Sequence, residues 1–203
     1  MHSLVLALFG ITVIFFTLPS YSYTFNVNNK GSLVDDDDAG QCHSQDATCK
    51  QKMTSTAVFG AGCFWGVEEK FRTLKGVQET TVGYAGGDTV NPTYEQICAD
   101  KTGHAEVVKI DFNPEQITYK ELLDVFWKAH DPTTVNRQGP DVGRQYRSVI
   151  FYANKEQEKL AHQTKDALIK KGIKAVTDII PSSTFYNAED YHQKYIAKRK
   201  GLL

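Results

Sequence analysis

The sequence predicts a layered α/β domain in which helices pack on one mixed β-sheet. Segments with strand character alternate with helical segments from about residue 55 to residue 180, in the order β-α-β-α-β-α-β-α-β. The chain has 203 residues, of which 41% are hydrophobic and 11% aromatic. That length and composition suit one domain with an ordinary core plus appendages. The alternation does not reveal the order of the strands within the sheet.

The first half of the predicted domain contains three strands and two helices. In chain order they are a strand at 56–60, a helix from Cys63 to Gly76, a strand at 77–84, a short helix at 94–99 and a strand at 104–112. The first helix has apolar residues at helical spacing and follows a tight Gly60-Ala61-Gly62 turn. The strand at 104–112 alternates between polar and apolar residues and ends at Asn113-Pro114, which favours a turn.

The second half contains two longer helices and two strands. They are a helix at 119–130, a strand at 147–152, a helix at 156–171 and a strand at 177–180. The helix at 119–130 is amphipathic because Leu122, Leu123, Phe126 and Trp127 recur at helical spacing. Pro181 stops the last strand because proline has no backbone N–H to donate.

The N-terminal residues differ from the rest of the chain. Residues 4–18 are almost all apolar and are too few to cross a bilayer as a helix of about 1.5 Å per residue. Together with small residues before a cleavage site after Ser22, they predict a signal peptide at 1–22 and entry into the secretory pathway; a retained anchor is the alternative. Residues 23–53, with the run Asp35–Asp38, predict a flexible acidic linker before a folded domain at 54–203.

The charge balance excludes one broad class of function. The formal net charge is -1, whereas nucleic-acid binding domains usually carry a basic face or stripe. A metal site is not predicted either, because the spacing of Cys42, His43 and Cys49 does not match the usual paired ligands. We therefore expect neither nucleic acid nor a metal ion as a partner.

Cys63 is the residue most suited to chemistry. It follows a glycine-rich turn and opens a helix, where unpaired backbone N–H groups and the helix dipole favour a negative charge. We expect the pKa of its thiol to fall below about 8.5 by one or more units, which would make it a nucleophile. The alternative is a buried cysteine that packs as a small hydrophobic residue.

Phe64, Trp65 and Glu106 supply the remaining parts of a reaction site. The two adjacent aromatic residues point in different directions from a helix and can form the wall of a pocket for a methyl group or thioether. The alternative is that both belong to the core. For Phe64 alone, the core is the better interpretation. Glu106 lies on a half-buried strand, where burial raises the pKa of a carboxyl group toward that of a general acid. The alternative is a solvent-facing glutamate. Tyr94 and Tyr146 could add phenolic donors, but alone they are weak signals.

Seven sequence blocks, in order, resemble the signature of the A-type peptide methionine sulfoxide reductases. They are Gly62–Glu68, Gly83–Gly87, Asn91–Tyr94, Gly103–Val108, Phe126–Pro132, Gln145–Ser148 and Ala188–Gln193. The resemblance covers roughly residues 55–197. It implies the α+β fold of that family, with a mixed sheet, flanking helices and a ferredoxin-like core.

The resemblance also implies an activity and a set of roles. The enzyme would reduce the S epimer of methionine sulfoxide, free or in proteins, as a monomer that repairs oxidised proteins. Cys63 would be the nucleophile and would become a sulfenic acid, while Glu106 would donate a proton to the sulfoxide oxygen. Tyr94 and Tyr146 would hydrogen-bond that oxygen and Asp141 would orient the polar network. Phe64 and Trp65 would hold the methyl group.

The chain departs from that family in how the enzyme is returned to its reduced form. Many members carry a resolving cysteine in a C-terminal tail, whereas the last cysteine here is Cys98, which we interpret as structural. Cys42 and Cys49 could pair with each other, or one of them could attack the Cys63 sulfenic acid. The third route is an external thiol, thioredoxin or a similar reductant, with no bound cofactor.

Two other functions remain open from the residues alone. A papain-like cysteine hydrolase would pair Cys63 with a histidine base, for which His130 or His192 is available. A secreted binding module held by disulfides would oxidise Cys63 to a structural partner. Glu106 as a proton donor and the resemblance favour the reductase over both.

Overall fold

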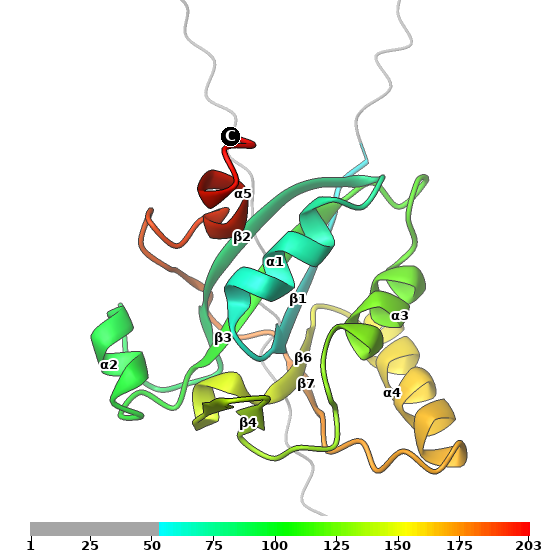
Figure 1. The fold of residues 1–203 in the computed structure, drawn as a ribbon. Helices are drawn as coiled ribbons and strands as arrows, with labels where there is room; N and C mark the ends of the chain where they lie inside the picture. Colours follow the sequence, from blue (N-terminus) through cyan, green and yellow to red (C-terminus); the bar gives the residue numbers. More distant parts are fainter. Residues whose placement is uncertain (1–52) are drawn as a thin grey trace, which may run out of the picture. The chain divides into compact units, whose positions relative to one another are not determined.

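The computed structural model describes residues 53–203 (Figure 1). The predicted signal peptide and nearly all of the predicted linker, with Cys42 and Cys49, lie outside the described residues. Within residues 53–203, no helix is long and apolar enough to cross a membrane.

A six-stranded mixed sheet forms the centre of the domain, in the order β7-β6-β1-β3-β2-β8. The strands are β1 (Ser55–Ala61), β2 (Val77–Ala85), β3 (Ala105–Phe112), β6 (Ser148–Tyr152), β7 (Asp178–Pro181) and β8 (Tyr186–Asn187). All neighbouring pairs are antiparallel except β6 and β7, which are parallel. The four antiparallel strands β6-β1-β3-β2, joined through two crossover helices, give the ferredoxin-like core that the family resemblance implies.

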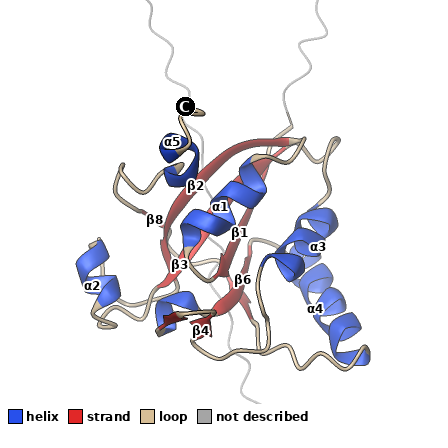
Figure 2. Cartoon of the chain, viewed as in Figure 1, coloured by secondary structure: helices blue, strands red, loops and turns tan. Residues whose placement is uncertain are grey.

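Three helices cover one face of this sheet: α1 (Phe64–Arg72), α3 (Tyr119–Ala129) and α4 (Lys155–Lys170) (Figures 1 and 2). Each begins at a different kind of cap. Thr118 and Glu121 form a capping box at α3, and the Asn154 side chain accepts the Gln157 N–H at α4. At α1 the cap residue is Cys63, whose side chain makes no capping hydrogen bond. That leaves its sulfur available for other contacts.

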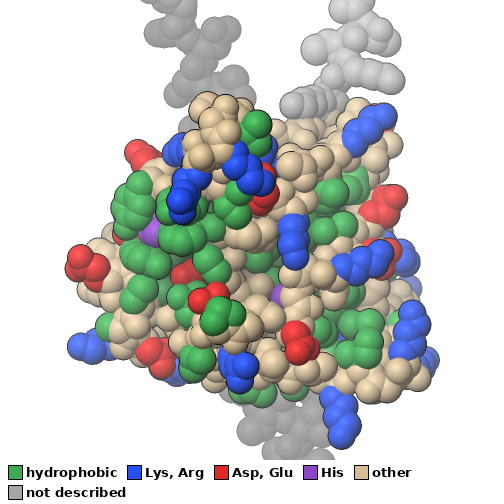
Figure 3. All heavy atoms as spheres, in the orientation of Figure 1, with side chains coloured by type: hydrophobic (Ala, Val, Ile, Leu, Met, Phe, Trp, Pro, Cys, Tyr) green, Lys and Arg blue, Asp and Glu red, His purple; other side chains and the backbone are tan. Residues whose placement is uncertain are grey.

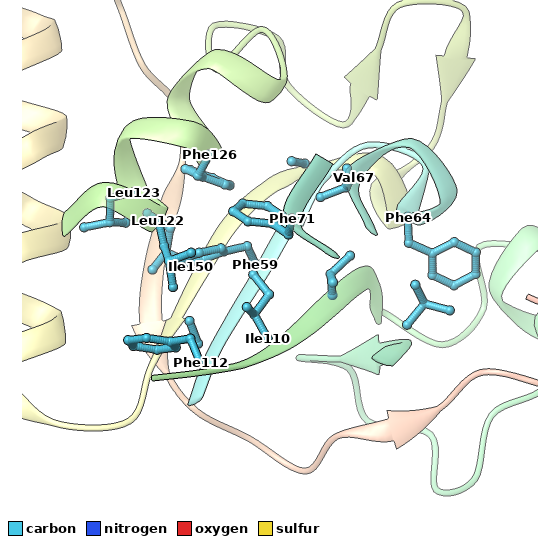
Figure 4. Close-up of a cluster of buried hydrophobic side chains, with 14 of the residues drawn as sticks. Phe59, Phe64, Val67, Phe71, Ile110, Phe112, Leu122, Leu123, Phe126 and Ile150 are labelled. Atoms are coloured by element: carbon cyan, nitrogen blue, oxygen red, sulfur yellow. The ribbon is translucent and has the colours of Figure 1, made fainter. Parts of the chain in front are cut away.

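Aromatic and aliphatic side chains fill the layer between the helices and the sheet (Figure 4). Phe59 of β1 lies at its centre, with ring centroids 5.7 Å from Phe71 of α1 and 5.1 Å from Phe126 of α3. Ile110 of β3 and Ile150 of β6 are fully buried beside them. Burial of this apolar surface fixes α1, and with it Cys63, against the ends of β1 and β3.

The opposite face of the sheet has a smaller core. Val107, Val149 and Phe151 are buried there, and Phe185 and Ile180 of the later segments pack against them. Because both faces are covered, β3 is buried along most of its length, although its sequence alternates like that of a half-exposed strand. Glu106 lies on the same face as Val108 and Ile110, which is the face that α1 covers.

The elements that the sequence analysis missed are short. They are β4 (Arg137–Gln138), β5 (Asp141–Val142), a 3-10 helix η1 (Arg144–Tyr146), β8, and α5 (Tyr195–Arg199). The predicted short helix at 94–99 is α2 (Tyr94–Cys98), which begins with a capping box between Thr93 and Gln96.

In the view of Figure 3, Lys and Arg side chains are interspersed with Asp and Glu rather than gathered in a stripe.

Candidate active site

Cys63 lies between the end of β1 and the first turn of α1. Gly62, just before it, has a φ of +92°, a left-handed conformation that glycine adopts without strain. The backbone N–H groups of Trp65 and Gly66, in the first turn of α1, favour the thiolate form of Cys63, although its side chain makes no capping hydrogen bond. The thiol is partly exposed, so a substrate can reach it.

The expected low pKa of Cys63 is wrong for this structure. Burial first, and the negative charge of Glu106 second, raise the pKa of the thiol to about 11. The N–H groups of Trp65 and Gly66 act in the opposite direction but do not outweigh burial and the carboxylate. Cys63 is therefore a thiol at neutral pH as long as Glu106 is ionised.

Glu106 occupies a fully buried position on β3, with 1% of its surface exposed. Its Oε2 accepts the backbone N–H of Phe64 at 3.1 Å, which places the carboxyl group against the peptide that follows Cys63. Burial raises the pKa of Glu106 to about 7; the Phe64 hydrogen bond opposes this shift, and the charge of Asp141 adds to it. The group thus carries its proton for much of the time at neutral pH.

Two tyrosines and one aspartate lie around this carboxyl group. Burial is the main reason that the pKa of Tyr94 lies above its usual range and that of Tyr146 reaches about 12, and the charge of Glu106 raises both. Tyr146 ends η1 and Asp141 begins β5, so the short hairpin brings both side chains to the site. The two phenols keep their protons at neutral pH and can donate hydrogen bonds.

Phe64 and Trp65 have different surroundings. Phe64 is 1% exposed and packs between Tyr84 and His192, with centroid distances of 5.9 Å and 5.1 Å. Phe64 belongs to the core cluster, as its residue type and position alone favoured, and the contact with the substrate methyl group that the resemblance implies for it stays a prediction. Trp65 is partly exposed and stacks on Tyr195 at 4.0 Å. Trp65 is therefore the aromatic ring next to Cys63 that a ligand can contact.

Cys98, which we interpreted from the sequence as structural, does not lie in the core. It is exposed on α2, and its thiol is hydrogen-bonded to the hydroxyl of Tyr94, which lies one helical turn earlier. The only cysteines described by the structure are Cys63 and Cys98, and both are free thiols.

Sequence reasoning missed two site residues in the segment that follows β8. Glu189 accepts the Tyr94 N–H through Oε1 and the Tyr84 hydroxyl through Oε2, each at 2.9 Å. His192 accepts the Trp65 indole N–H at 3.0 Å. Both belong to the block Ala188–Gln193, but nothing in the sequence of that block shows which side chains it contacts.

The hydrolase alternative has no support in this geometry. His130 bonds the Phe126 carbonyl through Nδ1 and Ser148 through Nε2, and burial lowers the pKa of His130 to about 4. The charged groups that shift the pKa of Cys63 are carboxylates, and no histidine is among them. Among residues 53–203, no cluster of three or more His, Cys, Asp or Glu side chains could hold a metal ion.

The turn before Cys63 gives a matched test of local strain. A Cβ at Gly62 would lie 2.7 Å from the Gln138 side chain, which itself holds Asp131 through two hydrogen bonds. We expect Gly62→Ala to reduce the free energy of unfolding by about 1–2 kcal/mol because of its positive φ. Gly66→Ala, inside α1 and with open space around the added methyl group, should raise it by about 0.5–1 kcal/mol. Equal effects in urea unfolding would contradict this assignment.

Comparison with known proteins gives one consistent result. Residues 55–202 match the family described as "Peptide methionine sulfoxide reductase". A peptide methionine sulfoxide reductase of Methanosarcina acetivorans is 61% identical over 150 residues, which are 72% of this chain and 79% of that protein. The one from Acinetobacter baumannii (strain AYE) is 56% identical over 142 residues, covering 70% and 82%.

Two solved structures share the fold. Reduced Mxr1 from Saccharomyces cerevisiae has a TM-score of 0.68 and 38% identity, covering 72% of this chain and 86% of that one. Methionine sulfoxide reductase A of Corynebacterium diphtheriae has a TM-score of 0.67 and 39% identity, covering 72% and 76%.

Proposed function

The chain belongs to the peptide methionine sulfoxide reductase family and reduces methionine sulfoxide in the repair of oxidised proteins, and we propose that Cys63 and Glu106 carry out the reaction. The Cys63 sulfur attacks the sulfur of the substrate, and Glu106 protonates the sulfoxide oxygen. The observation that carries this proposal is the hydrogen bond from the Phe64 N–H to the Glu106 carboxyl group, because it holds a buried acid beside the nucleophile.

In the reactive state, the Cys63 sulfur and the Glu106 carboxyl group hold a single proton between them. With Glu106 ionised, the pKa of Cys63 is about 11 and the sulfur is protonated. Transfer of that proton to Glu106 removes the negative charge beside the sulfur and creates a thiolate and a carboxylic acid together. The thiolate is the stronger nucleophile, and the carboxylic acid is the proton donor that a sulfoxide oxygen needs before its bond to sulfur breaks.

The reaction balances without a further reactant. Attack forms a transient bond between the Cys63 sulfur and the substrate sulfur. The oxygen then passes to Cys63: the bond between the two sulfurs and the bond from oxygen to the methionine sulfur break as a bond forms between the oxygen and the Cys63 sulfur. The Cys63 thiol becomes a sulfenic acid, which is the oxidation, and the sulfoxide becomes a thioether, which is the reduction. The thiol proton ends on the sulfenic oxygen by way of Glu106. Tyr94 and Tyr146 donate hydrogen bonds to the oxygen as its charge develops.

We further propose that the site accepts the S epimer. Trp65 provides a wall for the methyl group, Glu106 and the two phenols fix the oxygen, and Cys63 fixes the direction of attack. Three fixed positions around a chiral sulfur admit only one arrangement of its substituents. The family resemblance supports S as the hand that reacts.

A single-turnover experiment tests the epimer and the nucleophile together. Reduced enzyme is mixed without reductant with a peptide that contains both epimers of methionine sulfoxide, and the products are separated chromatographically. We expect one methionine per enzyme, formed from the S epimer, with the R epimer left intact. Equal consumption of both epimers would contradict the proposed arrangement of Trp65 and Glu106.

The return to the reduced state requires a second thiol, and we propose an external thioredoxin-like reductant. Among the described residues, Cys98 is the only other cysteine, and Cys42 and Cys49 lie outside them. Mass spectrometry after one equivalent of substrate distinguishes the routes. A trappable Cys63 sulfenic acid supports direct reduction by the external thiol. A disulfide from Cys63 to Cys42 or Cys49 would show instead that an internal cysteine attacks the sulfenic acid first.

We propose that the protein enters the secretory pathway, because its apolar segment at 4–18 and the small residues Ser20 and Ser22 are typical of a cleaved signal peptide. Expression in a eukaryotic cell followed by N-terminal peptide mapping tests this. A mature chain that begins at Tyr23 supports it, and a chain that retains Met1 in the cytosol would contradict it.

A further inference from the structure

The β4–β5 hairpin is tied to the rest of the domain by the side chain of Gln138. Its Oε1 accepts the backbone N–H of Asp131 at 3.1 Å, and its Nε2 donates to the Asp131 carbonyl at 3.0 Å. A primary amide that pairs with both backbone groups of one residue fixes direction as well as distance. Asp131 directly follows the cap of α3, and α3 is packed into the main core. The amide therefore joins the hairpin to a rigid part of the fold.

The stem of the same side chain lies against the turn that leads into Cys63. A Cβ at Gly62 would lie 2.7 Å from Gln138 Cγ and 2.8 Å from Gln138 Cβ, which is too close for any residue but glycine. Gln138 thus contacts Asp131 with its amide and Gly62 with its stem. Because the two contacts lie at opposite ends of one side chain, they fix where the hairpin sits beside Cys63.

Asp141 depends on this placement because nothing else fixes its carboxyl group. Gln138 and Asp141 are directly opposite each other in the hairpin. The Asp141 side chain is half-buried, and within residues 53–203 it makes no hydrogen bond and no ion pair. Its distance from the site is therefore set by its backbone, which Gln138 holds through the pairing of β4 with β5.

The charge of Asp141 acts on both groups of the reacting pair. It adds to the effects of burial and of Glu106 in raising the pKa of Cys63, and it adds to the effect of burial in raising the pKa of Glu106. The other titratable groups at the site are Tyr94 of α2 and Tyr146 of η1. A carboxylate held near these groups makes the site retain its protons to a higher pH.

The cations of this segment are engaged elsewhere. Arg137 and Arg144 flank Asp141 in the sequence, but Arg137 Nε donates to the Gly139 carbonyl and Arg144 is paired with Asp100 at 3.0 Å. Neither guanidinium group forms an ion pair with Asp141 in the described part of the chain. The charge of Asp141 therefore reaches the site without a cation beside it.

We propose that Gln138 is a positioning residue, which holds the Asp141 carboxylate at a fixed distance from Cys63 and Glu106 and so keeps a proton in the site. This inference rests on the proposed roles of Cys63 and Glu106. Gln138 acts through Asp141 and not on the substrate. Loss of its amide releases the hairpin, and Asp141 then turns toward water, where its charge is screened.

The pH profile of the single-turnover rate tests this role. Gln138→Met keeps the Cβ and Cγ that contact Gly62 and removes the amide. We expect the inflection at pH about 7, set by Glu106, to move down by about 0.5 pH unit, since a negative charge near an acid raises its pKa and removing that charge lowers it. Gln163→Met, the same change at an exposed position of α4, should leave the profile unchanged. An unchanged inflection in Gln138→Met would overturn the proposal.

A double-mutant cycle separates this role from a general loosening of the fold. Asp141→Asn removes the charge and keeps the shape of the side chain. If Gln138 acts through Asp141, Gln138→Met added to Asp141→Asn moves the inflection no further. A further fall of the same size as in the wild-type background would overturn the proposal.

Alkylation of Cys63 by iodoacetamide gives a readout that needs neither sulfoxide nor a proton donor. The reaction is followed by mass spectrometry of the Cys63 peptide. We expect Gln138→Met to react about threefold faster at pH 8, the change in thiolate that 0.5 pH unit produces. Equal rates would overturn the proposal. A wild type that is alkylated but reduces no sulfoxide would contradict the proposed function instead, and the alkylation rates would still decide the role of Gln138.

A shorter amide provides a second variant if Gln138→Met fails to fold. Gln138→Asn keeps the polar group but lacks one methylene, so it cannot bond both backbone groups of Asp131 while its stem stays on Gly62. The same faster alkylation is expected. A wild-type alkylation rate in this variant would overturn the proposal.

Discussion

Cys63→Ser is expected to abolish reduction of methionine sulfoxide, with a loss of about a thousandfold or more. Serine nearly keeps the size of the side chain and its place at the N-terminus of α1, but an alcohol does not ionise near neutral pH and does not accept an oxygen atom. The single-turnover yield of methionine per enzyme measures the loss directly. A folded variant with no product is the expected result, because the side chain contributes little to the core.

The matched control is the same substitution at the other free thiol. Cys98 is exposed, and serine can keep the hydrogen bond to Tyr94, so Cys98→Ser should retain most of the single-turnover yield. Circular dichroism should show both variants folded. If Cys98→Ser were inactive and Cys63→Ser active, the nucleophile would have to be reassigned.

The long elements of the fold were predictable because their patterns are local. The helices α1, α3 and α4 have apolar residues at helical spacing, and strands β1, β2, β3 and β6 have apolar runs between turn signals. Their antiparallel pairing was not predictable, because strand order depends on contacts between distant segments. It is the structure that shows β6-β1-β3-β2 as one ferredoxin-like unit.

The shorter elements escaped prediction because two residues cannot display a period. The hairpin β4–β5 and helix η1 carry Asp141 and Tyr146, so this part of the site was assigned only through the family resemblance. Glu189 and His192 follow the two-residue strand β8. Their roles depend on Tyr94 and Trp65, which lie far away in the sequence and adjacent in space.

The pKa of Cys63 illustrates the limit of local reasoning. The helix N-terminus is visible in the sequence and acts in the predicted direction, since the N–H groups of Trp65 and Gly66 lower the pKa. Burial of the thiol and the charge of Glu106 arise from tertiary structure and act in the opposite direction. Because these two effects are larger, the net shift is upward.

Glu106→Gln is expected to make Cys63 more reactive toward alkylation and to slow the reduction of methionine sulfoxide. Removal of the carboxylate charge lowers the pKa of Cys63, so the thiolate fraction at pH 8 rises and alkylation of Cys63 by iodoacetamide becomes faster. Loss of the proton donor slows sulfoxide reduction by about a hundredfold. A better nucleophile in a slower enzyme would show that the acid, rather than the thiolate, limits the reaction.

The pH dependence of the single-turnover rate is a second test of Glu106 as the acid. The pKa of Glu106 is raised to about 7, so in the wild type the first of the two protons on Glu106 and Cys63 is lost as the pH rises through about 7. The remaining proton is the one that the two groups share in the reactive state, because the pKa of Cys63 is about 11. Single-turnover rates should therefore rise across pH 7 and level off above it, and this inflection should be absent in Glu106→Gln. The control is Glu68→Gln, which changes another buried carboxyl group, held by Thr80 and the Lys194 N–H. It should leave the alkylation rate of Cys63 and the pH profile unchanged. If Glu106→Gln kept the wild-type rate and profile, Glu106 would not be the acid, and the proton would have to come from Tyr94 or Tyr146.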